Sequence, residues 1–187
     1  MADVWLVALV VVLVALAGLL TMAETALARV SRSQVDQARR DGNRQAERLL
    51  TVLSDRPRYV NVLLFLSTVA LTTATVIVGY VCVDGPIAAG GSTLWGVLVA
   101  VAVMVVASYV VVGVAARTLG RQHALRIALS AARSARGLAA VLGPLATLLI
   151  VIGNAVTPGR GYREGPFASQ AELRELVDLA EADDLIE

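Results

Sequence analysis

Three long apolar stretches dominate the pattern of hydrophobic and polar positions along the chain. The first has no charge from Val4 to Leu20, the second has none from Tyr59 to Val83, and the third runs from Leu94 to Ala116. Each is near the roughly 20 residues that a helix needs to cross a bilayer. The pattern predicts an all-α membrane protein with three transmembrane helices, over about residues 4–28, 59–83 and 94–116.

The polar segment 31–55 between the first two stretches has apolar residues at helical spacing, interrupted by Asp41-Gly42-Asn43. This pattern predicts an amphipathic helix–turn–helix along the inner membrane surface, with its arginines toward the lipid headgroups. Membrane lipid is therefore an expected partner.

Residues 121–156 form a second predicted juxtamembrane segment. Its apolar part, Gly137 to Val156, is long enough for a fourth crossing. Arginines flank both ends, however, and Gly143-Pro144 is expected to break the helix near its middle. Because basic flanks mark the inner side, a kinked or re-entrant element is favoured over a fourth span.

The amino-acid composition agrees with a membrane protein, and the charge and the cysteine and histidine counts exclude several kinds of ligand. The chain has 187 residues, of which 57% are hydrophobic, more than a typical soluble domain contains. All sixteen basic residues are arginine, which fits a GC-rich bacterial genome, and the net charge of +1 indicates no nucleic-acid partner. One cysteine and one histidine exclude a disulfide framework and a nitrogen–sulfur metal site.

The distribution of arginine predicts the orientation. Six arginines follow the first apolar stretch between residues 29 and 48, whereas the loop after the second stretch, 84–92, has none. An arginine excess marks the cytoplasmic side. We expect a multi-pass protein of the bacterial plasma membrane, with its N-terminus outside and its C-terminus in the cytoplasm.

Glu24 is an acid at the inner end of the first predicted span. A carboxylate in the hydrocarbon costs about 2.5–3.5 kcal/mol on insertion scales, so a functional role is the default interpretation. Thr21, Glu24 and Thr25 share one helix face, which makes an oxygen-rich stripe of the kind that hard cations use. The alternative is that Glu24 reaches the cytoplasmic water or pairs with an arginine.

The composition becomes acidic after a linker between Pro158 and Pro166. From Glu164 onward there are eight acidic residues and one arginine. We divide the chain into a transmembrane module, 1–158, and a linker with an acidic amphipathic helix, 159–187. That helix needs a packing partner, so we expect a cytoplasmic domain to follow it; the alternative is docking on the inner-surface arginines.

These features together resemble the transmembrane module of the cyclin-M/CorC magnesium-transporter family, whose older bacterial members were labelled haemolysin-like. Four segments carry the resemblance: Ala23-Glu24-Thr25-Ala26-Leu27, Arg56-Pro57-Arg58-Tyr59, Gly113-Val114-Ala115-Ala116-Arg117-Thr118-Leu119 and Glu172-Leu173-Arg174-Glu175-Leu176-Val177. They are similar to the family's first-span signature, the start of its second span, its G-E-x-x-P-K-T-L segment and the helix before its paired CBS domains. The resemblance covers essentially the whole chain.

The resemblance implies a homodimer that transports Mg²⁺, with a cytoplasmic CBS-type domain in the full-length protein. In that family Mg²⁺ is held by first-span hydroxyls, a second-span asparagine and the G-E-x-x-P segment. The matching metal-site candidates in this chain are Thr21, Glu24, Thr25, Thr72, Thr73 and Gly113. The family's third-span glutamate, proline and lysine are replaced by Val114, Ala116 and Arg117, which makes Arg117 a candidate charge partner of Glu24.

Three functions are compatible with the sequence. The first is a divalent-cation transporter of the Mg²⁺ efflux type, with a site between the three spans. The second is a degenerate, non-transporting scaffold in which Glu24 and Arg117 form a structural pair. The third is a regulatory anchor for a missing cytoplasmic domain. No nucleophile–base–acid set or phosphate-binding loop is present, so we do not expect an enzyme.

Overall fold

The computed structural model describes residues 2–84 and 93–156, and these residues form helices without a β-strand. Three helical segments are long and apolar enough to cross a membrane: Val4–Arg29, Arg56–Val83 and Thr93–Gln122. The first lies in α1 (Ala2–Arg29) and the second in α4 (Arg56–Asp84). The third, called the third span below, consists of α5 (Thr93–Ala107), η2 (Ser108–Ala116) and α6 (Arg117–Gln122). The predicted all-α membrane fold is confirmed.

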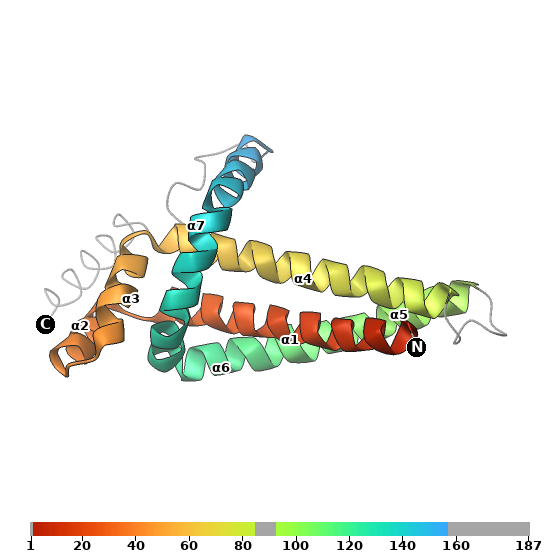
Figure 1. Ribbon diagram of the computed structural model, residues 1–187, viewed down its shortest axis with the longest axis horizontal. Coiled ribbons are helices and arrows are strands. Elements are labelled where there is room, and N and C mark those ends of the chain that lie inside the picture. The colour runs from red at the N-terminus through yellow and green to blue at the C-terminus, as the bar shows by residue number, and fades with distance from the viewer. Residues whose placement is uncertain (1, 85–92, 157–187) are drawn as a thin grey trace, which may run out of the picture. The chain divides into compact units, whose positions relative to one another are not determined.

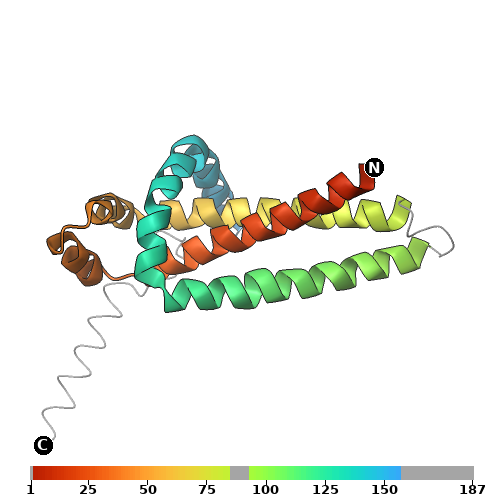
Figure 2. The ribbon, with the colours of Figure 1, turned by 60° about the horizontal axis from the view of Figure 1, so that its bottom comes forward.

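The three spans lie side by side in both ribbon views (Figures 1 and 2). α1 contacts α4 as well as η2 and α6, while α4 contacts α5. Large apolar side chains are exposed along the outer faces of these helices, among them Trp5, Leu9, Val76, Val101 and Val105. An apolar exterior on helices of this length suits a lipid environment, because a helix satisfies its own backbone hydrogen bonds there.

α1 and the third span approach each other closely at two glycines. A Cβ atom added at Gly18 would lie 3.1 Å from a methyl carbon of Val111. A Cβ atom at Gly120 would lie 2.8 Å from the Met22 carbonyl oxygen, which leaves no space for a side chain. These two contacts fix the register of the third span along α1.

Gly96 provides a third close contact, between α5 and α4. A Cβ atom there would lie 2.6 Å from the carbonyl oxygen of Cys82. Gly96 and Ala100 form a small-x-x-x-small pattern that is often a helix–helix contact surface. In this chain the glycine contacts α4 of the same chain.

The segment before α4 forms a helix–turn–helix, as expected. α2 (Arg32–Arg40) begins with Ser31, whose side chain accepts from the Gln34 N–H in a capping box. α3 (Arg44–Ser54) begins after Asn43, which accepts from the Gln45 N–H. Gly42 between them has a positive φ of 84°, a conformation that glycine adopts without steric cost. The turn therefore lies where Asp41-Gly42-Asn43 predicted it.

An inner core cluster joins this helix pair to the ends of the spans. It combines the end of α1, both short helices, the start of α4 and the first turns of α7 (Ala124–Val156), and its fully buried members include Leu27, Val30, Val35, Leu49, Val52 and Ala128. Arg56 strengthens the junction by donating to the carbonyls of Ala28 at 3.3 Å and Val30 at 2.7 Å. These bonds satisfy carbonyls at the end of α1 that have no helical partner.

The chain divides into two compact units, residues 1–146 and 147–187, and the described part of the second is the end of α7. Within the first unit, α7 crosses the beginning of α4 (Figures 1 and 2), where Ala139 packs on Val62. The predicted break at Gly143-Pro144 is not found, because α7 continues through Pro144. In the turn before the proline, Arg58 donates to the Ala139 carbonyl at 3.4 Å. The acidic helix predicted after residue 158 lies outside the described residues.

Candidate functional site

Glu24 lies on the last two turns of α1 and is half-buried. Its neighbour Thr25 packs against Gly120, where a Cβ atom would lie 2.9 Å from the Thr25 Cβ. The glycine thus brings α6 against the α1 turn that carries the acid. Glu24 is the one carboxylate among the three candidate spans.

Arg117 is the charged residue that acts on Glu24 electrostatically. Across residues 2–84 and 93–156, however, the ion pair that forms joins Arg58 to Asp55, and Glu24 makes no hydrogen bond or ion pair. The predicted charge partner is therefore near Glu24 without being bonded to it. The carboxylate oxygens remain available to another ligand.

Two buried hydroxyls lie farther into the bundle. In the described part of the chain, Thr21 and Ser67 are the buried polar side chains, with 3% and 6% of their surface exposed. The Ser67 hydroxyl donates to the Leu64 carbonyl at 2.9 Å. A hydroxyl that donates one bond keeps its oxygen lone pairs, so it can still accept from a water or bind a cation.

These two hydroxyls come from two helices that contact each other, and each lies between the same two apolar clusters. Toward the outer end, Val14 of α1 packs with Ala74 of α4. Toward the inner end, Ala23 of α1 shares the inner core cluster with Leu63 of α4. Thr21 lies between Val14 and Ala23 on α1, and Ser67 lies between Leu63 and Ala74 on α4, so both buried hydroxyls fall between the two apolar clusters.

Thr72 and Thr73 are not buried in the α1–α4 contact. Both are exposed, and they flank the positions Leu71 and Ala74 that pack in the outer cluster. The buried face of α4 instead follows Ser67, Ala70, Ala74 and Val81 at helical spacing. The inclusion of Thr72 and Thr73 in a metal site therefore stays a prediction, and the buried hydroxyl that the structure shows on α4 is that of Ser67.

Gly113 lies in η2, a π-helix of nine residues from Ser108 to Ala116. Stretches of π-helix are rare and often mark functional sites, because the shifted hydrogen-bond pattern alters which carbonyls are available. Since Gly18 contacts Val111 and Met22 contacts Gly120, Gly113 lies opposite the turn of α1 that precedes Thr21. The sequence analysis selected Gly113 but did not predict the π-helix.

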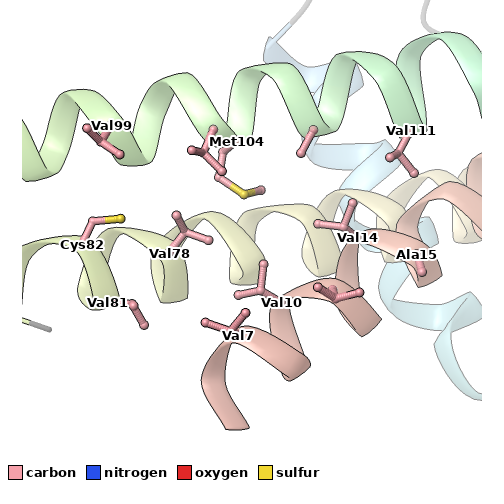
Figure 3. A pocket seen from close by; sticks show the side chains of 13 residues that line it. Val7, Val10, Val14, Ala15, Val78, Val81, Cys82, Val99, Met104 and Val111 are labelled. Atoms are coloured by element: carbon pink, nitrogen blue, oxygen red, sulfur yellow. The ribbon is translucent and has the colours of Figure 1, made fainter. Parts of the chain in front are cut away.

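A separate cavity of about 550 Å³ lies in the outer half of the bundle and is unsuited to an ion. Figure 3 shows its walls, with Val7 and Val10 from α1, Val78 and Cys82 from α4, and Met104 from α5. The lining side chains are apolar apart from the Cys82 thiol. Because a cation in such a space would lose its hydration without gaining oxygen ligands, the cavity lies outside the candidate site.

The arrangement offers oxygen ligands of mixed kind and little charge. The described residues contain no group of three or more histidine, cysteine or acidic side chains that could hold a metal ion. Thr21 and Glu24 do supply a buried hydroxyl and a carboxylate on α1. The helices that contact α1 add the buried hydroxyl of Ser67 from α4 and the irregular backbone of η2. Oxygen ligands suit hard cations such as Mg²⁺, which tolerate partial hydration.

Comparison with known proteins agrees with this membrane architecture. The family model described as cyclin M transmembrane N-terminal domain matches residues 8–187. The chain is 46% identical over 171 residues to UPF0053 protein Mb2387c of Mycobacterium bovis and to UPF0053 protein Rv2366c of Mycobacterium tuberculosis. These alignments cover 91% of this chain and 38% of each relative, so the chain spans well under half of their length.

Proposed function

The chain belongs to the cyclin M transmembrane family, and we propose that it carries Mg²⁺ across the membrane at a site between α1, α4 and η2. The observation that carries this proposal is the pair of buried hydroxyls, Thr21 and Ser67, between two apolar clusters. Glu24 lies one helical turn farther inward on α1. Buried polar groups inside a membrane bundle are costly and typically mark a substrate or ion pathway.

The charges of the site favour a partly hydrated ion. Glu24 supplies one negative charge against the two positive charges of Mg²⁺, and Arg117 adds a positive charge nearby. Removing every water from the ion here would leave a large uncompensated desolvation cost. Mg²⁺ dehydrates reluctantly and usually keeps several waters in proteins. We therefore propose that Thr21 and Ser67 accept hydrogen bonds from the waters of the ion while Glu24 provides the attracting charge.

Removal of either buried hydroxyl tests this site. In proteoliposomes loaded with a Mg²⁺-sensitive dye, Thr21→Val and Ser67→Ala are each expected to lower Mg²⁺ flux about five-fold, the equivalent of one lost hydrogen bond of about 1 kcal/mol. Thr72→Val and Thr73→Val are matched controls on exposed positions of α4 and should change flux by less than about two-fold. Equal losses in all four variants, or no loss in the first two, would refute the proposed site.

A non-transporting scaffold is the second candidate, and the proximity of Arg117 to Glu24 is the observation that favours it. In that function the two charges would hold α6 to α1. The described residues show no ion pair between them, and Gly120 already provides a close backbone contact at the same place. These features support transport over a purely structural role for Glu24.

The properties of the full-length protein follow as further parts of the proposal. We propose a homodimer in the bacterial plasma membrane, with its N-terminus outside, its C-terminus in the cytoplasm and no enzymatic activity. We also propose that a CBS-type domain follows the acidic residues of 164–187 and regulates transport. The support for this last part is that the relatives are much longer than this chain, which covers 38% of their length.

A further inference from the structure

A polar hollow of about 370 Å³ lies between α3 and α7, away from the cation site. It is lined by Arg48 of α3 and by Arg133, Arg136 and Gly137 of α7. Leu49 of α3 and the α7 residues Ala132 and Ala135 are buried in the inner core cluster. Arg48 directly precedes Leu49, while Arg133 and Arg136 directly follow Ala132 and Ala135, so packing of the two helices places the three arginines along the line where α3 meets α7.

No acidic side chain neutralises these arginines in the part of the chain that the structure describes. The ion pair found there joins Arg58 to Asp55, and Glu47, the acid beside Arg48, takes part in none. Three guanidinium groups around one hollow repel one another. An anion placed between them removes this repulsion and gains charge-assisted hydrogen bonds, which are about twice as strong as neutral ones.

We propose that this hollow binds the phosphate group of an anionic phospholipid. A guanidinium offers paired N–H donors whose geometry matches two phosphate oxygens, so arginine is well suited to this ligand. The position of the hollow near the ends of the spans favours a lipid headgroup as the source of the phosphate. Leu27 near the end of α1 and Val60 in the first turns of α4 share the inner core cluster with Leu49 and Ala132. The hollow is therefore tied to the ends of the spans, where lipid headgroups surround a membrane protein.

Gly137 allows a test that leaves the arginines in place. A Cβ atom added there would meet nothing within 4 Å, so a longer side chain has room. Gly137→Glu adds an internal carboxylate one helical turn from Arg133, whereas Gly137→Gln adds nearly the same shape without the charge. Both replace an exposed helical glycine with a better helix former, so neither change should impair folding.

The experiment measures lipid retention by the purified chain in detergent, using native mass spectrometry. Wild type is expected to retain palmitoyl-oleoyl-phosphatidylglycerol at least about five-fold better than phosphatidylcholine, since one juxtamembrane arginine contributes roughly that factor. Arg133→Gln and Gly137→Glu should each remove about five-fold of this preference. Gly137→Gln and two arginine changes outside the hollow, Arg44→Gln and Arg126→Gln, should preserve it.

Three outcomes would overturn the assignment. The first is an equal loss of retention in the hollow variants and the control variants, which would indicate general surface charge. The second is displacement of the lipid by inorganic phosphate at the same concentration, which would identify a free anion as the ligand. The third is lipid retention that appears only after the acidic residues of 164–187 are neutralised, because that segment would then occupy the hollow.

Discussion

Replacing Glu24 with glutamine is expected to lower Mg²⁺ flux by at least about ten-fold, the largest functional effect that the structure indicates. Glu24 is the one carboxylate in the three candidate spans, so glutamine removes the whole attracting charge while keeping the side chain's shape. Two unit charges about 4 Å apart attract by roughly 4 kcal/mol at an effective dielectric constant of 20. Even a third of that value corresponds to a ten-fold change.

Mg²⁺ flux into proteoliposomes at several Mg²⁺ concentrations measures this effect. Arg117→Gln is the comparison variant, because it removes a positive charge where Glu24→Gln removes a negative one. Because Arg117 acts on Glu24 and adds positive charge near the ion, its removal should lower the Mg²⁺ concentration that gives half-maximal flux. A scaffold function predicts instead that the two variants lose thermal stability and leave flux unaltered. Unchanged flux in Glu24→Gln would exclude Glu24 from the transport site.

Gly120→Ala is expected to cause the largest loss of stability, about 3 kcal/mol, at the upper end of the range for overpacked sites. The new methyl carbon would lie 2.8 Å from the Met22 carbonyl oxygen and 2.9 Å from the Thr25 Cβ. The carbonyl belongs to the helix backbone, so the clash is relieved only by moving α6 away from α1. That movement also displaces the turn carrying Glu24, and Mg²⁺ flux should fall together with stability.

Thermal unfolding of the detergent-solubilised protein measures the change in stability. Gly79→Ala is the matched control, because a Cβ atom at Gly79 of α4 would meet nothing within 4 Å. Alanine in a helix is about 1 kcal/mol more favourable than glycine, so this variant should be as stable as wild type or slightly more stable. If Gly120→Ala unfolded at the same temperature as Gly79→Ala, the close contact between α6 and α1 would be wrong.

The sequence was sufficient to predict the helices but insufficient to predict how their faces meet. Long uncharged stretches identified the three spans, and Asp41-Gly42-Asn43 identified the turn between α2 and α3, because these signals are local. Gly143-Pro144 was expected to break the segment 137–156 near its middle, yet α7 continues through Pro144. Earlier in α7, Arg58 of α4 donates to the Ala139 carbonyl. That contact joins residues 81 positions apart and has no local signature.

In the candidate site, too, residues with a local sequence signal were predicted and features that depend on helix packing were not. Glu24 and Thr21 could be selected from sequence because a charge or hydroxyl within an apolar span is conspicuous. Ser67 was not selected because the hydroxyl side chains of α4 are spread around the helix, so its sequence does not indicate which face is buried. The π-helix around Gly113 was missed because it depends on a shift in backbone hydrogen bonding rather than on a residue type.

The central claim is that Thr21, Ser67 and Glu24 together form a passage for Mg²⁺. Density maps of the purified protein at high Mg²⁺ and after chelation of the ion test it most directly. The account predicts density for a hydrated ion between the two hydroxyls and the Glu24 carboxylate at high Mg²⁺, and its loss after chelation. Identical maps, with the Glu24 carboxylate turned to the aqueous phase and no density at the hydroxyls, would contradict it.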